Sequence, residues 1–514
     1  MKLFILFLLV IHFCFSDCFG QAGILDSTFG INGTSLPYFP THSPISIAIE
    51  DDGKILTCGY YSIITDCGLT RYKQNGTPDS SFGSNGKALS IGNLGNLGRS
   101  VVTQQDGKIV VCSGNSDFEI ARYLTNGSPD LLFGGGGKVT YSIPGTISSD
   151  AYSVLVQPDG KIVVSGTAVI NNIQSIILIA RLNDNVTLDN TFGTNGVTTT
   201  LMGQSAASGI SVARQNDGKL VVGGYSISQS YVFKFALVRY NTNGVLDNAF
   251  GNGGKVEPFL NDINHPYDFC NSIVLQNDGK ILMAGATADT QDQFAVLRIN
   301  TDGSIDSSFG NNGIVKTDFF PYDNLNEASD VTIQQDGKII VVGYAYLDNS
   351  TGYNNAAMAR YNTNGTLDSS YGQNGKIVIA IDSITGFAAA AMQPDGKIVV
   401  AGVCETLGQL VWRFLSGLDI GVIDTSNPNN PILIYPNPIH SQATLQYTLS
   451  KDEQITIELF DIQGKVVQQF FTNETRTKGK HEEVLCFNEY LPAGNYILNI
   501  SNGRFKQGVK IVLH

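Results

Sequence analysis

Apolar runs without alternation recur along the chain, and each follows the tripeptide Asp-Gly-Lys. The residues after the lysine form short runs such as Ile55-Leu56-Thr57 and Ile162-Val163-Val164. A strand buried on both faces has this pattern, whereas a strand with one wet face alternates apolar and polar positions. The tripeptide occurs seven times, at intervals of 53 to 61 residues, with its glycine at Gly53, Gly107, Gly160, Gly218, Gly279, Gly337 and Gly396. The chain is therefore predicted to be a repeat protein.

The repeat spanning residues 309–372 predicts four short strands per unit. The first follows an Asn-Gly pair, the second and third flank Asp-Gly-Lys, and the fourth ends in Ala359-Arg360-Tyr361 before another Asn-Gly turn. Pro158 and Pro394 stand directly before Asp-Gly, as expected for a type I turn whose left-handed glycine closes a bulged hairpin. Four strands per unit, seven units and no helical period favour an all-β, seven-bladed β-propeller over a β-helix, whose coils are shorter.

Two further sequence markers recur with the same period as the tripeptide. An arginine recurs in each unit, and in six of them it precedes the aspartate of a Leu/Pro/Ile-Asp-x-x-Phe/Tyr-Gly box by eight residues. Lysine never replaces it, which favours two-pronged hydrogen bonds to a carboxylate or to carbonyl groups. A ring of arginines would also suit an anion, but repetition in every unit favours a structural clamp. The markers are Arg71, Arg122, Arg181, Arg239, Arg298, Arg360 and Arg413, with boxes centred on Phe29, Phe82, Phe133, Phe192, Phe250, Phe309 and Tyr371.

The two ends of the array complement each other. An isolated box, residues 25–30, precedes the first unit, while the strand around Arg413 has no intact box after it. Docking of the first segment beside the last strand would close the ring and remove an exposed sheet edge. We therefore predict closure by pairing of the two ends.

Residues 25–417 resemble the delta-60 repeat family of exported bacterial β-propellers. The resemblance rests on the segments MARYNTNGTLDSSYGQNGKIV and MQPDGKIVVAG, which match the family's ARYxxxGxLDxxFGxxGxV and VxxQxDGKIVVAG patterns. The family has no common enzymatic activity, so the resemblance implies a fold for residues 21–417 and no reaction.

The C-terminal part differs from the repeats. Residues 418–431 are rich in Pro and Asn and are expected to be a linker. Residues 432–514 show alternating strands joined by glycine turns, which predict a small antiparallel β-sandwich. Their segments YPNP, FDIQGK and LPAGNY are similar to the C-terminal sorting domain of the type IX secretion system of Gram-negative bacteria. This resemblance implies the secretion machinery as a partner, removal of the domain, and either release or attachment to surface polysaccharide.

The N-terminus and the composition support export. Residues 1–20 contain one lysine and an apolar run too short to span a bilayer comfortably, as in a secretory signal peptide. No later segment approaches the length of a spanning helix. The formal charge of −13 disfavours nucleic acid, which needs a basic face. Cys58 and Cys112 occupy a strand position that is small in the other repeats, which predicts small buried residues, although a Cys58–Cys67 bridge across one hairpin is an alternative.

Sites for chemistry are hard to find in the sequence. Histidine is scarce, with only His42 and His265 in the propeller, and no HExxH motif, Cys/His cluster or phosphate loop occurs. We therefore predict no catalytic residue, no metal site and no cofactor, and the binding residues stay unassigned. Residues 261–268 and 323–327 offer oxygen ligands for calcium but lack EF-hand spacing, so solvated loops are expected. Aromatics in residues 344–353 and 265–269 would either stack on a ligand or fill gaps between blades.

The expected protein is a secreted or surface-attached propeller that acts as a binding or adhesion scaffold for a glycan or protein. The alternative is an extracellular polysaccharide-degrading hydrolase or lyase on the same scaffold, since fold alone does not decide function. Acids or a metal in the central channel would favour the enzyme, and a shallow aromatic surface would favour the binder.

Overall fold

The computed structural model describes most of the chain. It covers residues 22–35, 42–61, 67–88, 91, 98–114, 116–171, 174–258, 260, 267–288, 292–320, 325–346, 354–381, 385–417, 433–435, 439, 441–449, 451–461, 465–488, 490–492, 494–501 and 506–513. All regular elements in these ranges are strands, as the sequence predicts.

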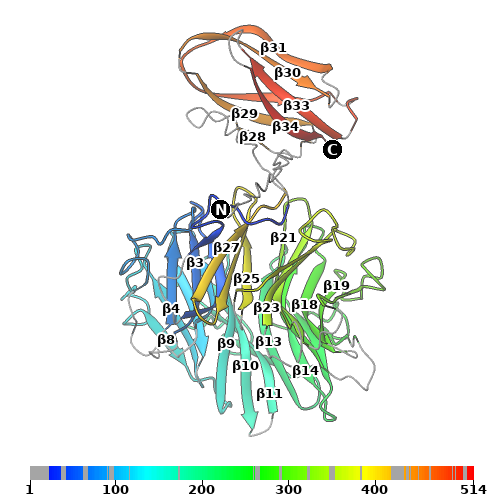
Figure 1. The fold of residues 1–514 in the computed structure, drawn as a ribbon. Coiled ribbons are helices and arrows are strands. Elements are labelled where there is room, and N and C mark those ends of the chain that lie inside the picture. Colours follow the sequence, from blue (N-terminus) through cyan, green and yellow to red (C-terminus); the bar gives the residue numbers. More distant parts are fainter. Residues whose placement is uncertain are drawn as a thin grey trace, which may run out of the picture.

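Seven antiparallel sheets form the blades of a β-propeller (Figure 1). Consecutive strands follow one another from the channel outward in each blade, except that the outermost strand of the last blade comes from the N-terminal end of the propeller. Blade 1 contains β2 (His42–Ile49), β3 (Ile55–Tyr61) and β4 (Cys67–Tyr72). Blades 2 to 4 contain β5 (Gly98–Thr103), β6 (Ile109–Gly114), β7 (Phe118–Tyr123) and β8 (Lys138–Tyr141); β9 (Ser148–Val156), β10 (Ile162–Asn171), β11 (Gln174–Leu182) and β12 (Val197–Thr200); and β13 (Ala206–Arg214), β14 (Leu220–Ile227), β15 (Phe233–Tyr240) and β16 (Lys255–Val256).

Blades 5 and 6 repeat the same order. They contain β17 (Asp268–Leu275), β18 (Ile281–Ala288), β19 (Asp292–Ile299) and β20 (Ile314–Thr317); and β21 (Asn326–Ile333), β22 (Ile339–Tyr346), β23 (Asn354–Tyr361) and β24 (Lys376–Ile379). Blade 7 joins β25 (Thr385–Met392), β26 (Ile398–Cys404) and β27 (Gly408–Phe414) to β1 (Thr34–Ser35) from the other end of the propeller.

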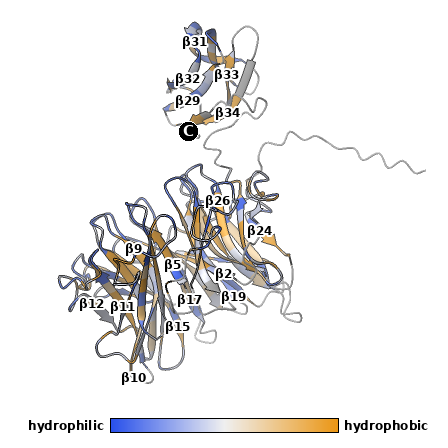
Figure 2. Ribbon diagram, turned by 90° about the vertical axis from the view of Figure 1, so that its left-hand side faces the viewer, coloured by the Kyte–Doolittle hydropathy of each residue, from blue (hydrophilic) through white to orange (hydrophobic). Residues whose placement is uncertain are grey.

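The hydrophobic cores lie between blades. Each of seven clusters takes buried side chains from two neighbouring blades, so the strands that follow Asp-Gly-Lys are covered on both faces. Figure 2 shows these strands as largely hydrophobic and their turns as largely hydrophilic. Burial on two faces explains the lack of alternation in the sequence. Cys58 and Cys112 lie fully buried in two of these strands, as predicted, and the side chain of Cys67 lies outside the described residues.

The predicted ring closure is confirmed. Thr34 and Ser35 of β1 pair with Trp412 and Val411 of β27, and Leu25 forms a bridge with Phe414. Among the described residues, the core at this seam, between blades 7 and 1, contains five buried hydrophobic side chains, those of Phe29, Ile55, Tyr72, Val399 and Val411. A polar network supplements it, because the Gln409 amide donates to the Thr57 hydroxyl at 2.6 Å and to the Tyr72 hydroxyl at 3.1 Å.

The C-terminal region folds as two facing sheets, as the alternating pattern predicts. One sheet contains β28 (Leu433–Tyr435), β29 (Gln442–Leu449) and β32 (Gly479–Cys486). The other contains β31 (Val466–Arg476), β30 (Glu453–Phe460), β33 (Gly494–Ser501) and β34 (Lys506–Leu513). Leu445, Ile457, Leu498 and Ile511 belong to one core between the sheets, so this region is a β-sandwich with its own hydrophobic centre.

Candidate functional site

The two faces of the ring differ in how regular their connections are. On one face, every turn between the first and second strands of a blade has five residues, and the connections from third to fourth strand in blades 2 to 6 all have fourteen. On the other face, the hairpins between second and third strands have two to seven residues, and the connections between blades 2 to 7 have five to eleven. We call these the constant face and the variable face. Constant length is what a scaffold requires, and variable length is where recognition is built.

The repeated motifs all lie on the constant face. The seven Asp-Gly-Lys glycines have positive φ angles between 78° and 87°, which confirms the predicted left-handed turn. In blades 1, 2, 4 and 6 an Asn-Gly turn approaches the neighbouring blade closely: a Cβ at Gly76 would lie 2.7 Å from the Phe29 ring. The motif glycines thus serve turn geometry and close packing between blades.

The repeated arginines are clamps, as predicted. Arg181 donates from Nε to Asp189 Oδ2 at 2.7 Å, and its Nη1 reaches the carbonyl oxygen of Thr242 in the next blade at 2.6 Å. Its guanidinium lies over the box ring of Phe192, 4.6 Å from the centroid. All seven arginines pair with the box aspartate of their own blade and stack on its aromatic ring. Each carboxylate and ring is therefore already engaged by the scaffold.

The hydrogen-bond and ion-pair partners of the clamp aspartates determine the pKa of their carboxyl groups. Burial alone would raise the pKa of Asp189 and Asp306, but hydrogen bonds from neighbouring Lys, Thr and Ser side chains and the adjacent arginines outweigh it. The pKa of both carboxyls is held well below the ordinary value, so they are ionised at neutral pH.

The channel is lined by the first strand of every blade, and each of these strands carries a β-bulge in its pairing with the second. The residue after the bulge is a serine in five blades, and in four of them its hydroxyl accepts the backbone N–H of the next blade at 3.2 to 3.3 Å. These residues, which form a girdle around the channel, are Ser46, Ser100, Ser153, Ser211, Ser272, Asp330 and Ala389.

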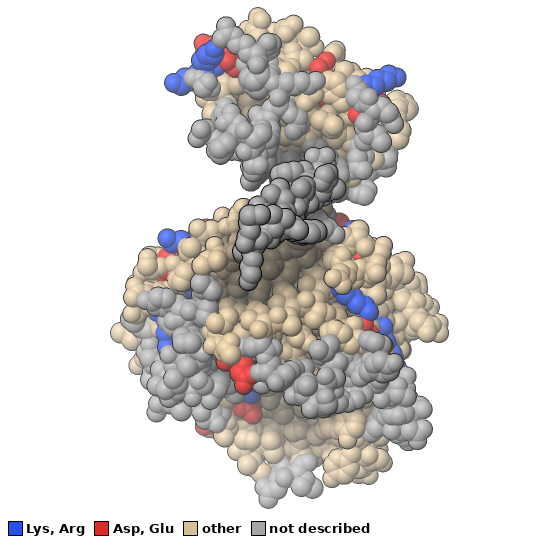
Figure 3. Space-filling model, viewed as in Figure 1, with Lys and Arg blue, Asp and Glu red and all other residues tan. Residues whose placement is uncertain are grey.

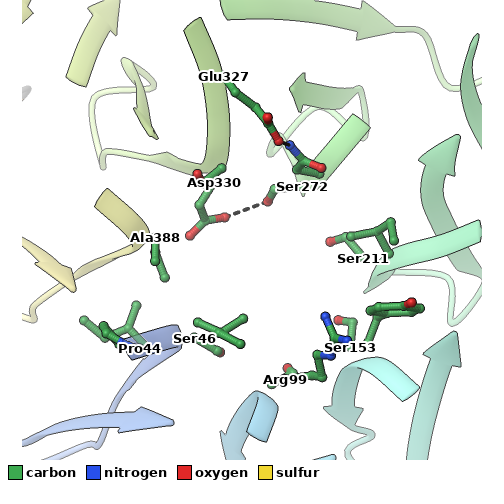
Figure 4. Close-up of a pocket in the computed structure, with 17 residues that line it drawn as sticks. Pro44, Ser46, Arg99, Ser153, Ser211, Ser272, Glu327, Asp330 and Ala388 are labelled. Carbon is green, nitrogen blue, oxygen red and sulfur yellow. Dashed lines mark hydrogen bonds between the residues drawn. The ribbon is translucent and has the colours of Figure 1, made fainter. Parts of the chain in front are cut away.

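Blade 6 changes the girdle. Ser272 donates to Asp330 Oδ1 at 2.6 Å (Figure 4), and Asp330 Oδ2 accepts the N–H of Ala390 at 2.9 Å. Burial raises the pKa of Asp330, although these hydrogen bonds oppose it. Nearby, Glu327 accepts from the Asn271 amide at 2.8 Å and from the Tyr344 hydroxyl at 2.5 Å. The channel wall of blade 6 thus carries two carboxyls whose hydrogen-bond partners are neutral.

Blades 2 and 3 contribute a cation and a ring to the same cavity. The Arg99 guanidinium lies over the ring of Tyr152, 4.7 Å from its centroid. Arg99 Nε is buried and has no hydrogen-bond partner in the described part of the chain. Burial raises the pKa of Tyr152, with Arg99 opposing the shift. Figure 4 places Arg99 on the opposite side of the cavity from Glu327 and Asp330.

Aromatic rings gather on the variable face at blades 4 and 5. Phe233 contacts Phe269 with ring centroids 4.6 Å apart and stacks on Tyr267 at 5.5 Å. Tyr225 meets Phe269 edge to face at 5.3 Å. Tyr267 is 53% exposed, and Tyr231 on the adjacent hairpin is 75% exposed. We call Tyr225, Phe233, Tyr267 and Phe269 the aromatic patch.

The candidate residues from the sequence have mixed outcomes. Within residues 265–269, Phe269 packs against Phe233 of the neighbouring blade, as the gap-filling reading predicts, while Tyr267 is exposed and its stacking on a ligand stays a prediction. Tyr344 and Tyr346 are half-buried in blade 6, and His265 and Tyr353 lie outside the described residues. The expectation of a solvated loop is wrong for Asp268, which is buried and accepts from the Thr287 hydroxyl at 2.6 Å, and for Asn326, which is buried at the start of β21. The remainder of residues 261–266 and residues 323–324 lie outside the described ranges.

Sequence reasoning missed the channel residues, although a signal was available. Each girdle residue stands six positions before the aspartate of its Asp-Gly-Lys motif, from Ser46 before Asp52 to Ala389 before Asp395. Aligning the repeats on the tripeptide would have revealed a serine column with two departures, at Asp330 and Ala389.

Charge and metal chemistry leave few other candidates. On the face shown in Figure 3, the described Lys, Arg, Asp and Glu side chains are scattered among uncharged ones. Among the residues described, no three His, Cys, Asp or Glu side chains are grouped so that they could hold a metal ion. Nor does the described part of the chain contain a helix with the length and hydrophobicity needed to cross a bilayer.

Two family models match the chain. One, a domain of unknown function (DUF5122) beta-propeller, matches residues 50–82, 104–133, 157–192, 215–250, 276–309 and 334–371. The matched segments do not include blade 7, whose strands come from the two ends of the propeller sequence. The other, a secretion system C-terminal sorting domain, matches residues 433–514.

Comparison with individual proteins gives only distant likenesses. No curated protein matches the sequence significantly. A virginiamycin B lyase from Staphylococcus aureus is similar in structure, with 14% identity and a TM-score of 0.45 over 74% of this chain and 98% of that one. PorZ, a surface component of the type IX secretion system of Porphyromonas gingivalis, has 10% identity and a TM-score of 0.39 over 91% of this chain and 59% of its own.

Proposed function

Because this chain belongs to the DUF5122 β-propeller repeat family and ends in a secretion system sorting domain, we propose that it is an exported binding scaffold for a glycan or protein. The sorting domain directs export by type IX secretion to the cell surface or the extracellular space of a Gram-negative bacterium. In this proposal residues 1–20 are a signal peptide, residues 21–417 the binding propeller, 418–431 a linker, and 432–514 a disposable address. A glycan is the favoured ligand.

The observation that carries the proposal is the aromatic patch. Exposed aromatic rings supported from below by other rings present flat, rigid surfaces at low conformational cost, as ligand sites do. Tyr267 rests on Phe233, which rests on Phe269, so its ring is held in place from beneath. The flat faces of a sugar or of an aromatic side chain suit such a surface.

The positions of the two ends of the propeller support a ligand site on the variable face. Residues Ala22 and Gly417 lie on the constant face, where Gly23 N–H donates to the Leu415 carbonyl at 2.8 Å. The linker to the sorting domain therefore starts from the face that carries the motifs. This leaves the variable face turned away from the point of attachment.

The channel carboxyls fit binding better than bond cleavage. A general acid needs a proton on an oxygen directed at the substrate. Asp330 accepts the Ser272 hydroxyl on one oxygen and a backbone N–H on the other, and Glu327 accepts from Asn271 and Tyr344. Both side chains are thus held as acceptors by neighbouring groups.

A glycan array probed with the exported chain tests the proposal, with cleavage of the same glycans assayed in parallel. Tyr267→Ala should weaken binding about fivefold or more, the cost of truncating a binding anchor, while Tyr267→Phe retains the ring and the affinity. Leu132→Ala is the matched control, because Leu132 is 93% exposed on the constant face. Cleavage of a glycan would instead establish the alternative function, a polysaccharide-degrading enzyme. Loss of binding in Leu132→Ala but not in Tyr267→Ala would place the binding site on the constant face and contradict the proposal.

A further inference from the structure

The central channel holds a cavity of about 350 Å³ with walls of opposite charge. We propose that this cavity binds a sugar residue carrying a carboxylate, a uronic acid at the end of a glycan. Arg99 would hold the carboxylate, while Glu327 and Asp330 accept hydrogen bonds from the sugar hydroxyls. The inference rests on the proposed function and names its ligand class.

Arg99 lines this cavity, and its buried Nε has no hydrogen-bond partner among the described residues. The seven clamp arginines all have a carboxylate partner, whereas the only described contact of the Arg99 guanidinium is the Tyr152 ring. A guanidinium offers five N–H donors in a planar fork that matches a carboxylate. Its stacking on Tyr152 fixes the plane of the fork, which lowers the entropy lost when an anion binds.

The opposite wall is suited to hydroxyl groups. Glu327 accepts one donor on each oxygen, and Asp330 Oδ2 accepts one, the Ala390 N–H. A carboxylate has about four acceptor positions, so each side chain can accept further hydrogen bonds. Sugar hydroxyls would meet these positions. Glu327 and Asp330 accept hydrogen bonds from neutral donors. An anion bound in the cavity would instead accept from Arg99, whose Nε has no partner among the described residues.

The size of the cavity and its surroundings fit one terminal sugar. Its volume lies near the lower end of small-ligand sites, roughly 300–1,000 Å³. Strand β17 carries Asn271 and Ser272 on the cavity wall and, two residues before Asn271 toward the variable face, Phe269 of the aromatic patch. The aromatic patch would receive the sugar units that follow the bound one.

Titration calorimetry on the exported chain tests this inference with trimers of galacturonate, their methyl esters and trimers of glucosamine. The ester is the matched control, since it removes the charge and keeps every hydroxyl. We expect the galacturonate trimer to bind at least tenfold more tightly than its ester, with an affinity that falls as salt is added. Arg99→Gln should weaken the galacturonate trimer about tenfold to a hundredfold and leave the ester unchanged.

Arg214→Gln is the matched control variant, because Arg214 ends the first strand of blade 4 at the constant face. It should bind the trimer as the unmodified chain does. Arg99→Lys keeps the charge without the fork and should give an intermediate loss. The ratio of the affinities for the galacturonate trimer and for its ester is measured on the unmodified chain. The inference therefore stays testable even if the Arg99→Gln protein misfolds.

Each outcome has a defined meaning. Equal binding of acid and ester, or preference for the glucosamine trimer, overturns the acidic-sugar site while the glycan-binding function stands. A chain that binds array glycans through Tyr267 but none of the three trimers overturns the site in the same way. Failure to bind any glycan on the array overturns the proposed function as well.

Discussion

The ring closure allows a quantitative test through Asp26→Asn. Arg413 donates from Nε to Asp26 Oδ2 at 2.9 Å, its Nη2 lies 2.8 Å from the same oxygen, and Lys397 Nζ lies 3.2 Å from it. Burial would raise the pKa of Asp26, but hydrogen bonds from Thr28 and the two cations lower it from 3.8 to about 2. Since one pKa unit corresponds to about 1.4 kcal/mol, the folded seam favours the carboxylate by roughly 2 kcal/mol.

The substitution should therefore loosen the seam locally. A loss of roughly 2 kcal/mol raises the population of the opened seam about thirtyfold, which hydrogen exchange measures in residues 22–35 and in β27. Asp247→Asn is the control, because Asp247 makes the same clamp to Arg239 at 2.8 Å inside a continuous blade. Its variant should lose similar clamp energy without faster exchange at the seam.

The pH dependence gives the sign. A carboxyl whose folded pKa is depressed contributes stability above its unfolded pKa, and that stability disappears as the pH falls through the folded pKa. The difference in exchange between the unmodified chain and Asp26→Asn should thus be full above about pH 5 and vanish near pH 2. Identical seam exchange in both proteins at pH 7 would refute the role given to this clamp.

Two further substitutions probe the scaffold, each by chemical denaturation. Gly160→Ala should cost about 1–2 kcal/mol, because φ is 83° and no atom lies within 4 Å of the added Cβ, so only backbone strain acts. Gly166→Ala should cost about 3 kcal/mol or more, since its Cβ would lie 1.9 Å from the Asp150 carbonyl oxygen; equal losses at the two glycines would contradict this. Ala389→Ser should stabilise the ring by about 0.5–1.5 kcal/mol, because a serine there would accept the N–H of Ile47 as the girdle serines accept those of other blades. A lower denaturation midpoint for this variant would show that the seam cannot accommodate the hydroxyl.

The fold was predictable because its determinants are local and repeated. Left-handed glycines such as Gly160 and the pairing of Arg181 with Asp189 recur at fixed spacing, and the unmatched markers at Phe29 and Arg413 indicate where the ring joins. The channel was not predictable in the same way. Whether Arg99 faces a cavity depends on which strand is innermost and on the register after its bulge, and neither follows from hydrophobicity alone.

The aromatic patch shows the same limit. Tyr267 and Asp268 are adjacent in sequence, yet one is half exposed and the other is buried against Thr287. The difference arises at the start of β17, where alternate side chains point in opposite directions. The composition of residues 265–269 was enough to single out this segment. Which of its side chains are exposed and which are buried depends on where β17 begins.

The contact between Asp26 and Arg413 spans 387 positions of the chain. During synthesis, β1 and its flanking residues emerge first and must wait for the last blade before they can pair. Until then the nascent protein has two open sheet edges, each able to capture a strand from another molecule. Production of this protein is therefore expected to depend on holding the early segment apart from other chains until translation ends. Truncation anywhere before residue 414 should yield aggregates rather than a smaller ring.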